Sequence, residues 1–113
     1  MGQYIVVLST CPDDALARSL ASALVDNSLA ACVNILPRLT SVYSWQGKRE
    51  MDDEVLMIIK TRQSLYKDVE NYILEHHSYD VPEVIALPLT NGSASYLDWI
   101  DNQTRSPSVT KTN

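Results

Sequence analysis

The distribution of apolar and polar residues along the chain predicts three strands of ordinary length. Residues 4–9 form a nearly continuous apolar run, which is typical of a strand buried on both faces. Residues 53–61 have an apolar middle and are predicted to lie centrally in a sheet. Residues 83–89 are predicted as a last strand, and Pro88 indicates that its end lies at an edge, because proline cannot donate to a strand ladder.

A much longer extended segment covers residues 30–48 and is interrupted at Pro37. It ends in a turn at residues 46–48, which leads toward the 53–61 strand. At about 3.3 Å per residue the segment is roughly 55 Å long. A domain of about 100 residues has a radius of gyration near 13 Å. We therefore expect a long hairpin that protrudes from its own sheet.

Alternation along the protruding part places one set of residues on a single face: Leu39, Ser41, Tyr43 and Trp45. The overhang leaves unpaired backbone groups in water, and long edges of that kind are normally paired or covered. We infer that the chain pairs with copies of itself. Tyr43 and Trp45 are the expected interface anchors, because aromatic side chains bury large areas at low entropic cost.

Three segments have the features of helices. The first opens at residues 10–14, where Pro12 suits a first helical turn and the following aspartates favour the positive end of the dipole. Ser64 is a plausible N-cap for the second, and residues 92–93 cap a short third helix. The predicted apolar positions are Leu16, Leu20, Ala23 and Leu24 in the first helix, Leu65, Val69, Tyr72, Ile73 and His76 in the second, and Tyr96, Leu97, Trp99 and Ile100 in the third.

The resulting order is βαββαβ with an extra C-terminal helix. Two right-handed crossovers in this order give an α+β, ferredoxin-like sandwich, in which a four-stranded antiparallel sheet carries helices on one face. We expect a single domain over residues 1–113. Its ordered core is predicted over about 3–101, followed by a polar tail at 102–113.

Charge and composition exclude some classes of binding partner. The formal net charge of −5 argues against nucleic acid or an anionic membrane surface as the main partner. No apolar run approaches the roughly 20 residues that a membrane span requires. The N-terminal residues enter a strand directly, without a signal-peptide pattern. We therefore expect a cytoplasmic protein whose two cysteines, Cys11 and Cys32, are free thiols.

Five short motifs stand in a characteristic order along the chain. They read LAACVN at 29–34, YSWQGK at 43–48, IIKT at 58–61, YDVPE at 79–83 and YLDWI at 96–100. Together they resemble the CutA family of divalent-cation tolerance proteins, and the resemblance covers essentially residues 4–100. It implies a cytoplasmic homotrimer built by strand pairing between subunits. It also implies a link to copper and other divalent metal ions.

The resemblance also points to a metal site at the chain's only histidines, His76 and His77. Bacterial members with a proposed copper site have such a pair, together with a cysteine at the position of Ser9. Cys11 shares a strand face with that position and is the candidate replacement. Imidazole with thiolate suits copper or zinc. The alternative is structural: adjacent helical residues point about 100° apart, so that His76 completes the apolar stripe and His77 caps the last carbonyls.

A second candidate site is a cleft between subunits that holds an anionic or metal-bound ligand. Lys60 ends the central strand and Glu83 begins the last one, and Tyr79 precedes it. Cys32 is the fourth candidate, although a free cysteine is commonly a small core residue. The acidic cluster at residues 50–54 is interpreted as a solvated face or as a weak cation site.

The leading functional hypothesis is a non-enzymatic homotrimer that binds divalent metal, with copper as the first ion, in metal tolerance or homeostasis. The alternative is a regulatory trimer like the PII proteins, which would bind a small anion between subunits. With only three glycines the chain has no glycine-rich phosphate loop. Catalysis is not expected, because no nucleophile elbow, HExxH motif or coherent Ser/His/Asp set occurs.

Overall fold

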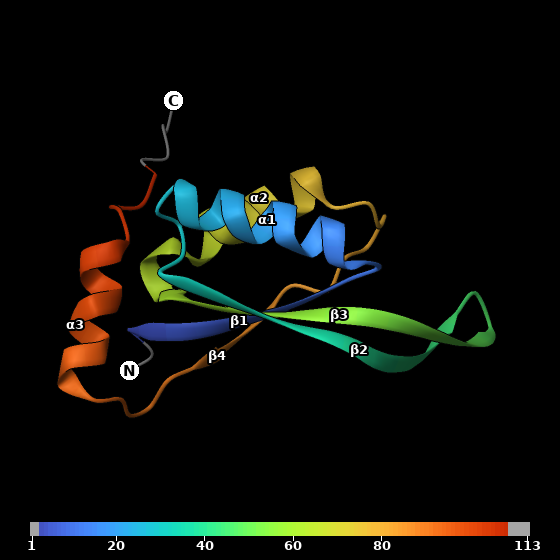
Figure 1. Ribbon diagram of the computed structural model, residues 1–113. Coiled ribbons are helices and arrows are strands. Elements are labelled where there is room, and N and C mark those ends of the chain that lie inside the picture. The colour runs from blue at the N-terminus through green and yellow to red at the C-terminus, as the bar shows by residue number, and fades with distance from the viewer. Residues whose placement is uncertain (1–2, 109–113) are drawn as a thin grey trace.

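The computed structural model describes residues 3–108 and has the predicted βαββαβ order with a C-terminal helix (Figure 1). The elements are β1 (Tyr4–Cys11), α1 (Asp14–Asp26), β2 (Cys32–Trp45), β3 (Lys48–Arg62), a 3₁₀ turn η1 (Gln63–Leu65), α2 (Tyr66–His76), β4 (Ile85–Pro88) and α3 (Ala94–Gln103). The α+β class is therefore confirmed.

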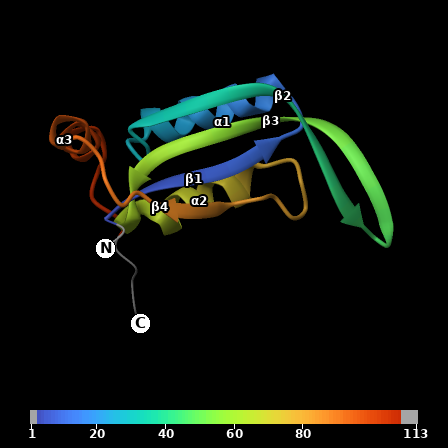
Figure 2. The ribbon, with the colours of Figure 1, turned by 90° about the horizontal axis from the view of Figure 1, so that it is seen from below.

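The sheet has four antiparallel strands in the order β2-β3-β1-β4. This order places β4 and its Pro88 at an edge, as predicted. Helices α1 and α2 lie on one face of the sheet, and the view from below shows the strands in front of them (Figures 1 and 2). The core lies between these layers and is formed by Ile5, Val7, Met57 and Ile59 of the sheet, Leu20 and Leu24 of α1, and Val69 and Ile73 of α2.

Helix α1 starts at an aspartate cap rather than at the proline. The side chain of Asp13 accepts a hydrogen bond from the Leu16 backbone N–H at 2.8 Å, so Pro12 precedes the helix instead of opening its first turn. Ala17 and Ala21 are buried in place of the predicted Leu16 and Ala23, which are only half-buried. The small alanine side chains let the helix backbone approach the sheet closely.

The start and end of α2 also differ from the sequence prediction. Residues Gln63–Leu65 form a 3₁₀ turn and α2 has no side-chain cap, so the assignment of Ser64 as an N-cap is wrong. His76 does not join the buried stripe, because its side chain is 44% exposed. Its ring instead stacks on Tyr72, with the ring centroids 4.0 Å apart.

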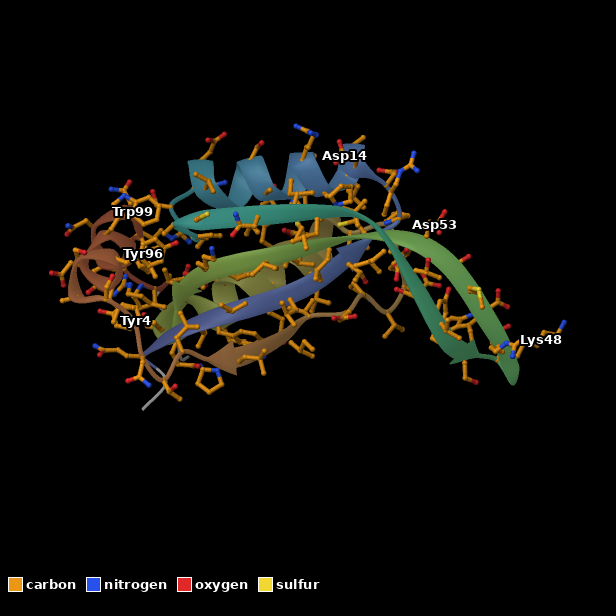
Figure 3. All side chains as sticks on the ribbon, turned by 60° about the horizontal axis from the view of Figure 1, so that its bottom comes forward. Tyr4, Asp14, Lys48, Asp53, Tyr96 and Trp99 are labelled. Carbon is orange, nitrogen blue, oxygen red and sulfur yellow. The ribbon has the colours of Figure 1, made fainter. Side chains whose placement is uncertain are left out.

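The long hairpin protrudes as predicted, but both of its strands are long, whereas the sequence predicted one long strand and one of ordinary length. β1 pairs with β3 only from Val55 to Arg62, so the outer parts of β2 and β3 pair with each other beyond the rest of the sheet (Figures 1 and 3). β3 therefore begins at Lys48 rather than at residue 53. Gln46 and Gly47 both have positive φ, at 51° and 78°, which fits a type I′ hairpin turn. Within the overhang, β2 and β3 pair with each other, and among residues 3–108 no further strand pairs with the other edge of either one.

A β-bulge explains the predicted interruption of β2 at Pro37. Leu36 pairs with Leu56, but Leu39 pairs with Glu54, so β2 carries one extra residue in this interval. Arg38 adopts φ of 58° there. Because side chains alternate between faces, the extra residue moves the odd-numbered residues that follow onto the face of Leu36.

The sheet face that α1 and α2 leave uncovered carries a group of aliphatic side chains. Side-chain alternation and strand register place Val6, Leu8, Leu36, Leu56, Ile58, Ile85 and Leu87 on it. Leu36, Ile85 and Leu87 are 43%, 51% and 53% exposed. We call these seven residues the open sheet face.

The chain remains packed on the domain beyond residue 101, where a polar tail was expected to begin. Helix α3 continues to Gln103. Arg62 then donates from Nε to the Thr104 hydroxyl at 2.8 Å, and the Arg105 backbone N–H donates to the Ser28 carbonyl at 2.9 Å. The last five residues of the predicted tail, 109–113, lie outside the described residues.

Candidate functional site

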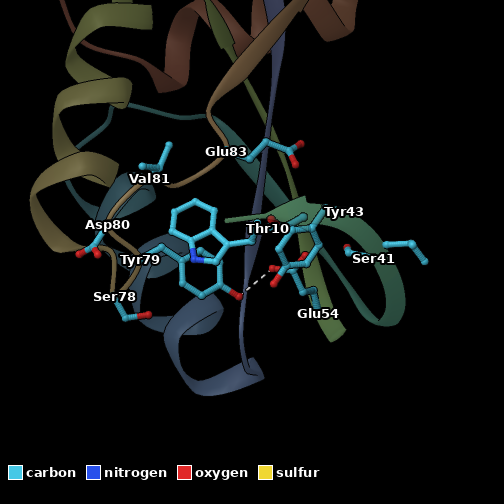
Figure 4. Close-up of a pocket in the computed structure, with 11 residues that line it drawn as sticks. Thr10, Ser41, Tyr43, Glu54, Ser78, Tyr79, Asp80, Val81 and Glu83 are labelled. Carbon is cyan, nitrogen blue, oxygen red and sulfur yellow. Dashed lines mark hydrogen bonds between the residues drawn. The ribbon is translucent and has the colours of Figure 1, made fainter. Parts of the chain in front are cut away.

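A hollow of about 640 Å³ lies between the protruding hairpin and the loop that joins α2 to β4 (Figure 4). We call it the hairpin hollow. It is lined by Thr10, Ser41, Val42, Tyr43, Trp45, Glu54, Ser78, Tyr79, Asp80, Val81 and Glu83. The β2 bulge contributes to its chemistry, because it brings Tyr43 and Trp45 to the same face as Glu54.

The hydroxyl of Tyr79 donates a hydrogen bond of 2.7 Å to Oε2 of Glu54 in the middle of the hollow (Figure 4). Glu54 is only 8% exposed, so this bond satisfies a carboxylate that has little access to water. Burial and the bond to Glu54 raise the pKa of Tyr79. On the hairpin, Tyr43 donates to Asp52, and this bond is the main reason that the pKa of Tyr43 is raised to about 12. Both phenols therefore remain protonated donors at neutral pH.

Carboxylates dominate the charge of the hollow. Glu54, Asp80 and Glu83 line it, and within the part of the chain that the structure describes no Lys, Arg or His does so. Burial, together with the nearby charge of Glu54, raises the pKa of Glu83. The surroundings therefore disfavour a negative charge on Glu83, as is expected where a carboxylate has no counter-ion.

His77 fastens the loop of the hollow to the end of β1. Its Nδ1 accepts a hydrogen bond of 3.0 Å from the backbone N–H of Tyr79, which requires the proton to sit on Nε2. Nε2 lies 2.8 Å from the carbonyl of Thr10 and donates to it. His77 was predicted to cap the last carbonyls of the helix, but His76 does so instead: its Nδ1 lies 2.9 Å from the carbonyl of Tyr72. His77 thus positions Tyr79.

The predicted metal ligands are not gathered into a ready site. Among residues 3–108, no three His, Cys, Asp or Glu side chains lie close enough together to hold a metal ion. Cys11 is fully buried in the core, and burial is the main reason that its pKa is raised to about 11. Both ring nitrogens of His77 are engaged, whereas Nε2 of His76 has no hydrogen-bond partner among the described residues. Metal ligation by His76, His77 and Cys11 stays a prediction.

The four candidates for the predicted cleft fall into two pairs. Tyr79 and Glu83 both line the hairpin hollow. Cys32 and Lys60 pair with each other in the β2–β3 register, and Lys60 lies six residues from Glu54 along β3, or roughly 20 Å. The structure therefore does not bring all four together within one copy. Cys32 is half-buried rather than in the core.

Thr10 and Glu54 line the hollow, and the sequence alone assigns neither of them to a site. No sequence pattern identifies Thr10, because it contributes a backbone carbonyl, which accepts from His77, and a small side chain in the lining. Glu54 was noticed only as part of an acidic cluster. Its partner Tyr79 lies 25 residues away, and no local pattern connects the two. Tyr43 and Trp45 line the hollow, and their role as interface anchors stays a prediction.

Comparisons with known proteins identify the family. The family described as "CutA1 divalent ion tolerance protein" matches residues 5–103. The divalent-cation tolerance protein CutA of Thermus thermophilus is 46% identical over 99 residues, which cover 88% of this chain and 96% of that protein. The crystal structure of CutA1 from Oryza sativa has a TM-score of 0.88 and 48% identity, and the match covers 90% of this chain and 94% of that one.

Some relatives are considerably longer than this chain. The chloroplastic protein CutA of Arabidopsis thaliana is 52% identical over 101 residues, which cover 89% of this chain but 56% of that protein. A CutA structure from Archaeoglobus fulgidus is named periplasmic, with 37% identity and a TM-score of 0.87 over 88% of this chain and 97% of that one. These names do not confirm a cytoplasmic location for the chain. No helix described between residues 3 and 108 is long and apolar enough to cross a membrane.

The matching family and its bacterial relatives from Thermus thermophilus and Pectobacterium atrosepticum are named for tolerance of divalent cations rather than for a reaction, and none of these names supports the PII-like alternative. The fold, the five motifs and the matches at 46% and 52% identity agree with one another. The chain belongs to the CutA1 divalent ion tolerance family.

Proposed function

We propose that this protein acts in divalent-cation tolerance as a non-enzymatic homotrimer that binds metal ions, with copper as the first ion to test. The family match over residues 5–103 carries the proposal. We also propose that it works in the cytoplasm, as the sequence predicts.

The open sheet face supports the assembly. Soluble monomers rarely expose large contiguous apolar patches, and this face consists of aliphatic side chains from all four strands. The protruding hairpin and the short edge strand β4 add backbone groups that a second copy can pair. Association through this surface would bury both features at once.

Substituting the open sheet face tests the assembly. Ile85→Asp places a charge on it, and Leu74→Asp on α2 is a matched control, because the two side chains are 51% and 50% exposed. Light scattering should give a trimer mass for the wild type and for Leu74→Asp, and a smaller mass for Ile85→Asp. A wild-type monomer, or equal masses for all three proteins, would contradict the assembly.

The predicted metal ligands differ in how ready they are. His76 presents a half-exposed ring with Nε2 available, and imidazole is a good ligand for copper and zinc. His77 must give up the hydrogen bond to Thr10 or to Tyr79 before it can ligate. Cys11 must lose a proton in a buried site that disfavours its thiolate. We therefore expect His76 to contribute most of the affinity.

Calorimetric titration with copper and zinc tests the metal proposal, with the assembly mass measured in the same buffer. His76→Ala and His77→Ala are compared with Asn71→Ala, which changes an exposed residue of α2 away from both histidines. We expect stoichiometric binding by the wild type and by Asn71→Ala, and a loss of affinity of about tenfold or more in His76→Ala. Equally weak binding by all four proteins would rule out a metal site at the histidines.

A further inference from the structure

We propose that Asn91 and Gly92 form a self-modifying site, at which Asn91 loses its side-chain amide as ammonia and becomes aspartate or iso-aspartate. The site lies in residues 89–93, which join β4 to α3 and belong to neither a helix nor a strand. This loop lies at the end of the domain away from the hairpin tip (Figure 1). It contains none of the seven residues of the open sheet face and none of the predicted metal ligands, so the proposal goes beyond metal tolerance.

The reaction needs only groups of the chain and water. The backbone nitrogen of Gly92 loses its proton and attacks Cγ of Asn91; the new N–Cγ bond closes a succinimide ring, and Nδ2 leaves with the proton as ammonia. Water then opens the ring. Opening at Cγ gives aspartate, whereas opening at the main-chain carbonyl gives iso-aspartate, in which the chain runs through the side chain of residue 91. One water is consumed, one ammonia is released, and nothing is oxidised or reduced.

Sequence and structure both leave the reacting atoms of this pair free. Asn91 is the only asparagine of the chain that precedes a glycine, and a residue without a side chain does not hinder the approach of its nitrogen to Cγ. Both residues are exposed. Within residues 3–108 the Gly92 backbone N–H forms no hydrogen bond, and the Asn91 amide forms only a long one, from Nδ2 to the Thr90 hydroxyl at 3.4 Å.

The other asparagines that the structure describes are held in less reactive settings. Asn27 donates from Nδ2 to the carbonyl of Ala23 at 2.7 Å. The next backbone nitrogen, that of Ser28, donates to the carbonyl of Val25 at 2.9 Å and is not free to attack. The remaining three lie inside a strand or a helix, and each precedes a residue with a large side chain: Asn34 in β2, Asn71 in α2 and Asn102 in α3.

The modification changes the start of α3. Ser93 is the N-cap of this helix, and no residue of the first turn, 94–97, is acidic. A carboxylate at position 91 therefore adds a negative charge near the positive end of the helix dipole. Iso-aspartate also lengthens the main chain just before Gly92, which packs so closely that an added Cβ would lie 2.9 Å from Cδ2 of Leu97. The iso product therefore shifts Gly92 relative to Leu97, whereas the ordinary aspartate keeps the contact.

The test incubates the wild-type assembly and the matched variant Asn91→Gln side by side. Glutamine keeps an exposed amide, but its attack needs a larger ring that closes more slowly. A third sample, the wild type unfolded in denaturant, gives the rate of the same chain without the fold. Peptide mass spectrometry measures the conversion of each asparagine with time, and methylation by an iso-aspartyl methyltransferase distinguishes the iso product. The melting temperatures of the two native proteins are compared first.

We expect Asn91 of the native assembly to convert at a rate within about tenfold of that of the unfolded chain, because exposed loops open readily. The rate should rise about tenfold between pH 7 and pH 8, because the reacting form is the deprotonated amide of Gly92. Asn27 and Asn34 of the native protein, and residue 91 of Asn91→Gln, should stay unmodified over the same time.

A native rate more than about a hundredfold below that of the unfolded chain would overturn the proposal, because it would show that the fold or a second copy shields Asn91. Conversion of Asn27 or Asn34 as fast as that of Asn91 in the native protein would also overturn it, since the structure would then not select the site. No metal ion and neither histidine enters these measurements, so the metal proposal succeeds or fails separately.

Discussion

Replacing Ser9 with alanine should stabilise this protein, although most core substitutions destabilise. Ser9 is fully buried on the helix-facing side of β1, opposite Met57 in the β3 register. Its Oγ has no hydrogen-bond partner among the described residues, and it is the only buried side-chain atom among them in this state. The neighbours on that strand face, Val7 and Cys11, are fully buried as well.

The expected gain follows from the cost of an unpaired polar group. A buried hydroxyl without a partner costs about 1–3 kcal/mol, and Ser→Ala removes it while deleting a single heavy atom. Allowing for the small void that remains, we expect a gain of about 1–2 kcal/mol. For a domain of this size, that gain raises the melting temperature by roughly 4–8 °C.

Thr61→Val is the matched control because it also removes a buried hydroxyl. Thr61 is fully buried, but its Oγ1 donates to the carbonyl of Leu29 at 2.6 Å. This variant should lose about 1–2 kcal/mol, because the carbonyl loses its partner. Both proteins are melted beside the wild type by circular dichroism at one protein concentration, since assembly makes the melting temperature depend on concentration. A lower melting temperature for Ser9→Ala would refute the reasoning, because it would mean that the hydroxyl is satisfied.

Three further predictions concern the hairpin hollow and the core thiol. Tyr79→Phe leaves the buried carboxylate of Glu54 without its donor, and chemical denaturation should show a loss of about 1–2 kcal/mol; unchanged stability would mean that water replaces the phenol at no cost. Because folding raises the pKa of Glu83, its folded-state penalty is present at high pH and absent when it is protonated. Glu83→Gln should therefore melt higher than the wild type at pH 8, and the difference should vanish below about pH 4.3; a difference independent of pH would contradict this. In a Cys32→Ala background, iodoacetamide should leave Cys11 unmodified in the native protein at pH 8 and modify it after unfolding, as mass spectrometry would show.

The sequence was sufficient for features that depend on local pattern. Three such features each depend on a few adjacent residues, and each occurs in the structure: the continuous apolar run of β1, the break in β2 at Pro37 and the Gln46–Gly47 turn. The cap of α3 is of the same kind, since Ser93 accepts from the backbone N–H of Tyr96.

Features that depend on how elements meet could not be read in this way. The burial of Ala17 in place of Leu16 is decided by how closely α1 approaches the sheet. The bond between Tyr79 and Glu54 joins a loop to a distant strand. The family resemblance pointed to His76 and His77 as metal ligands, and the sequence could not show that three of their ring nitrogens face backbone groups that only the folded chain brings near: those of Tyr72, Thr10 and Tyr79.

The bulge in β2 makes the hairpin sensitive to a kind of mutation that point substitutions do not sample. Deleting one residue, such as Arg38, would exchange the two sides of every residue from 39 to 45 while changing none of them. Thr40, Val42 and Ser44 would then lie on the side that Tyr43 and Trp45 now occupy. The number of residues between Leu36 and Leu39 therefore decides which side chains of the hairpin face the hollow. Relatives can be compared at this site only if they keep the same number of residues in this interval.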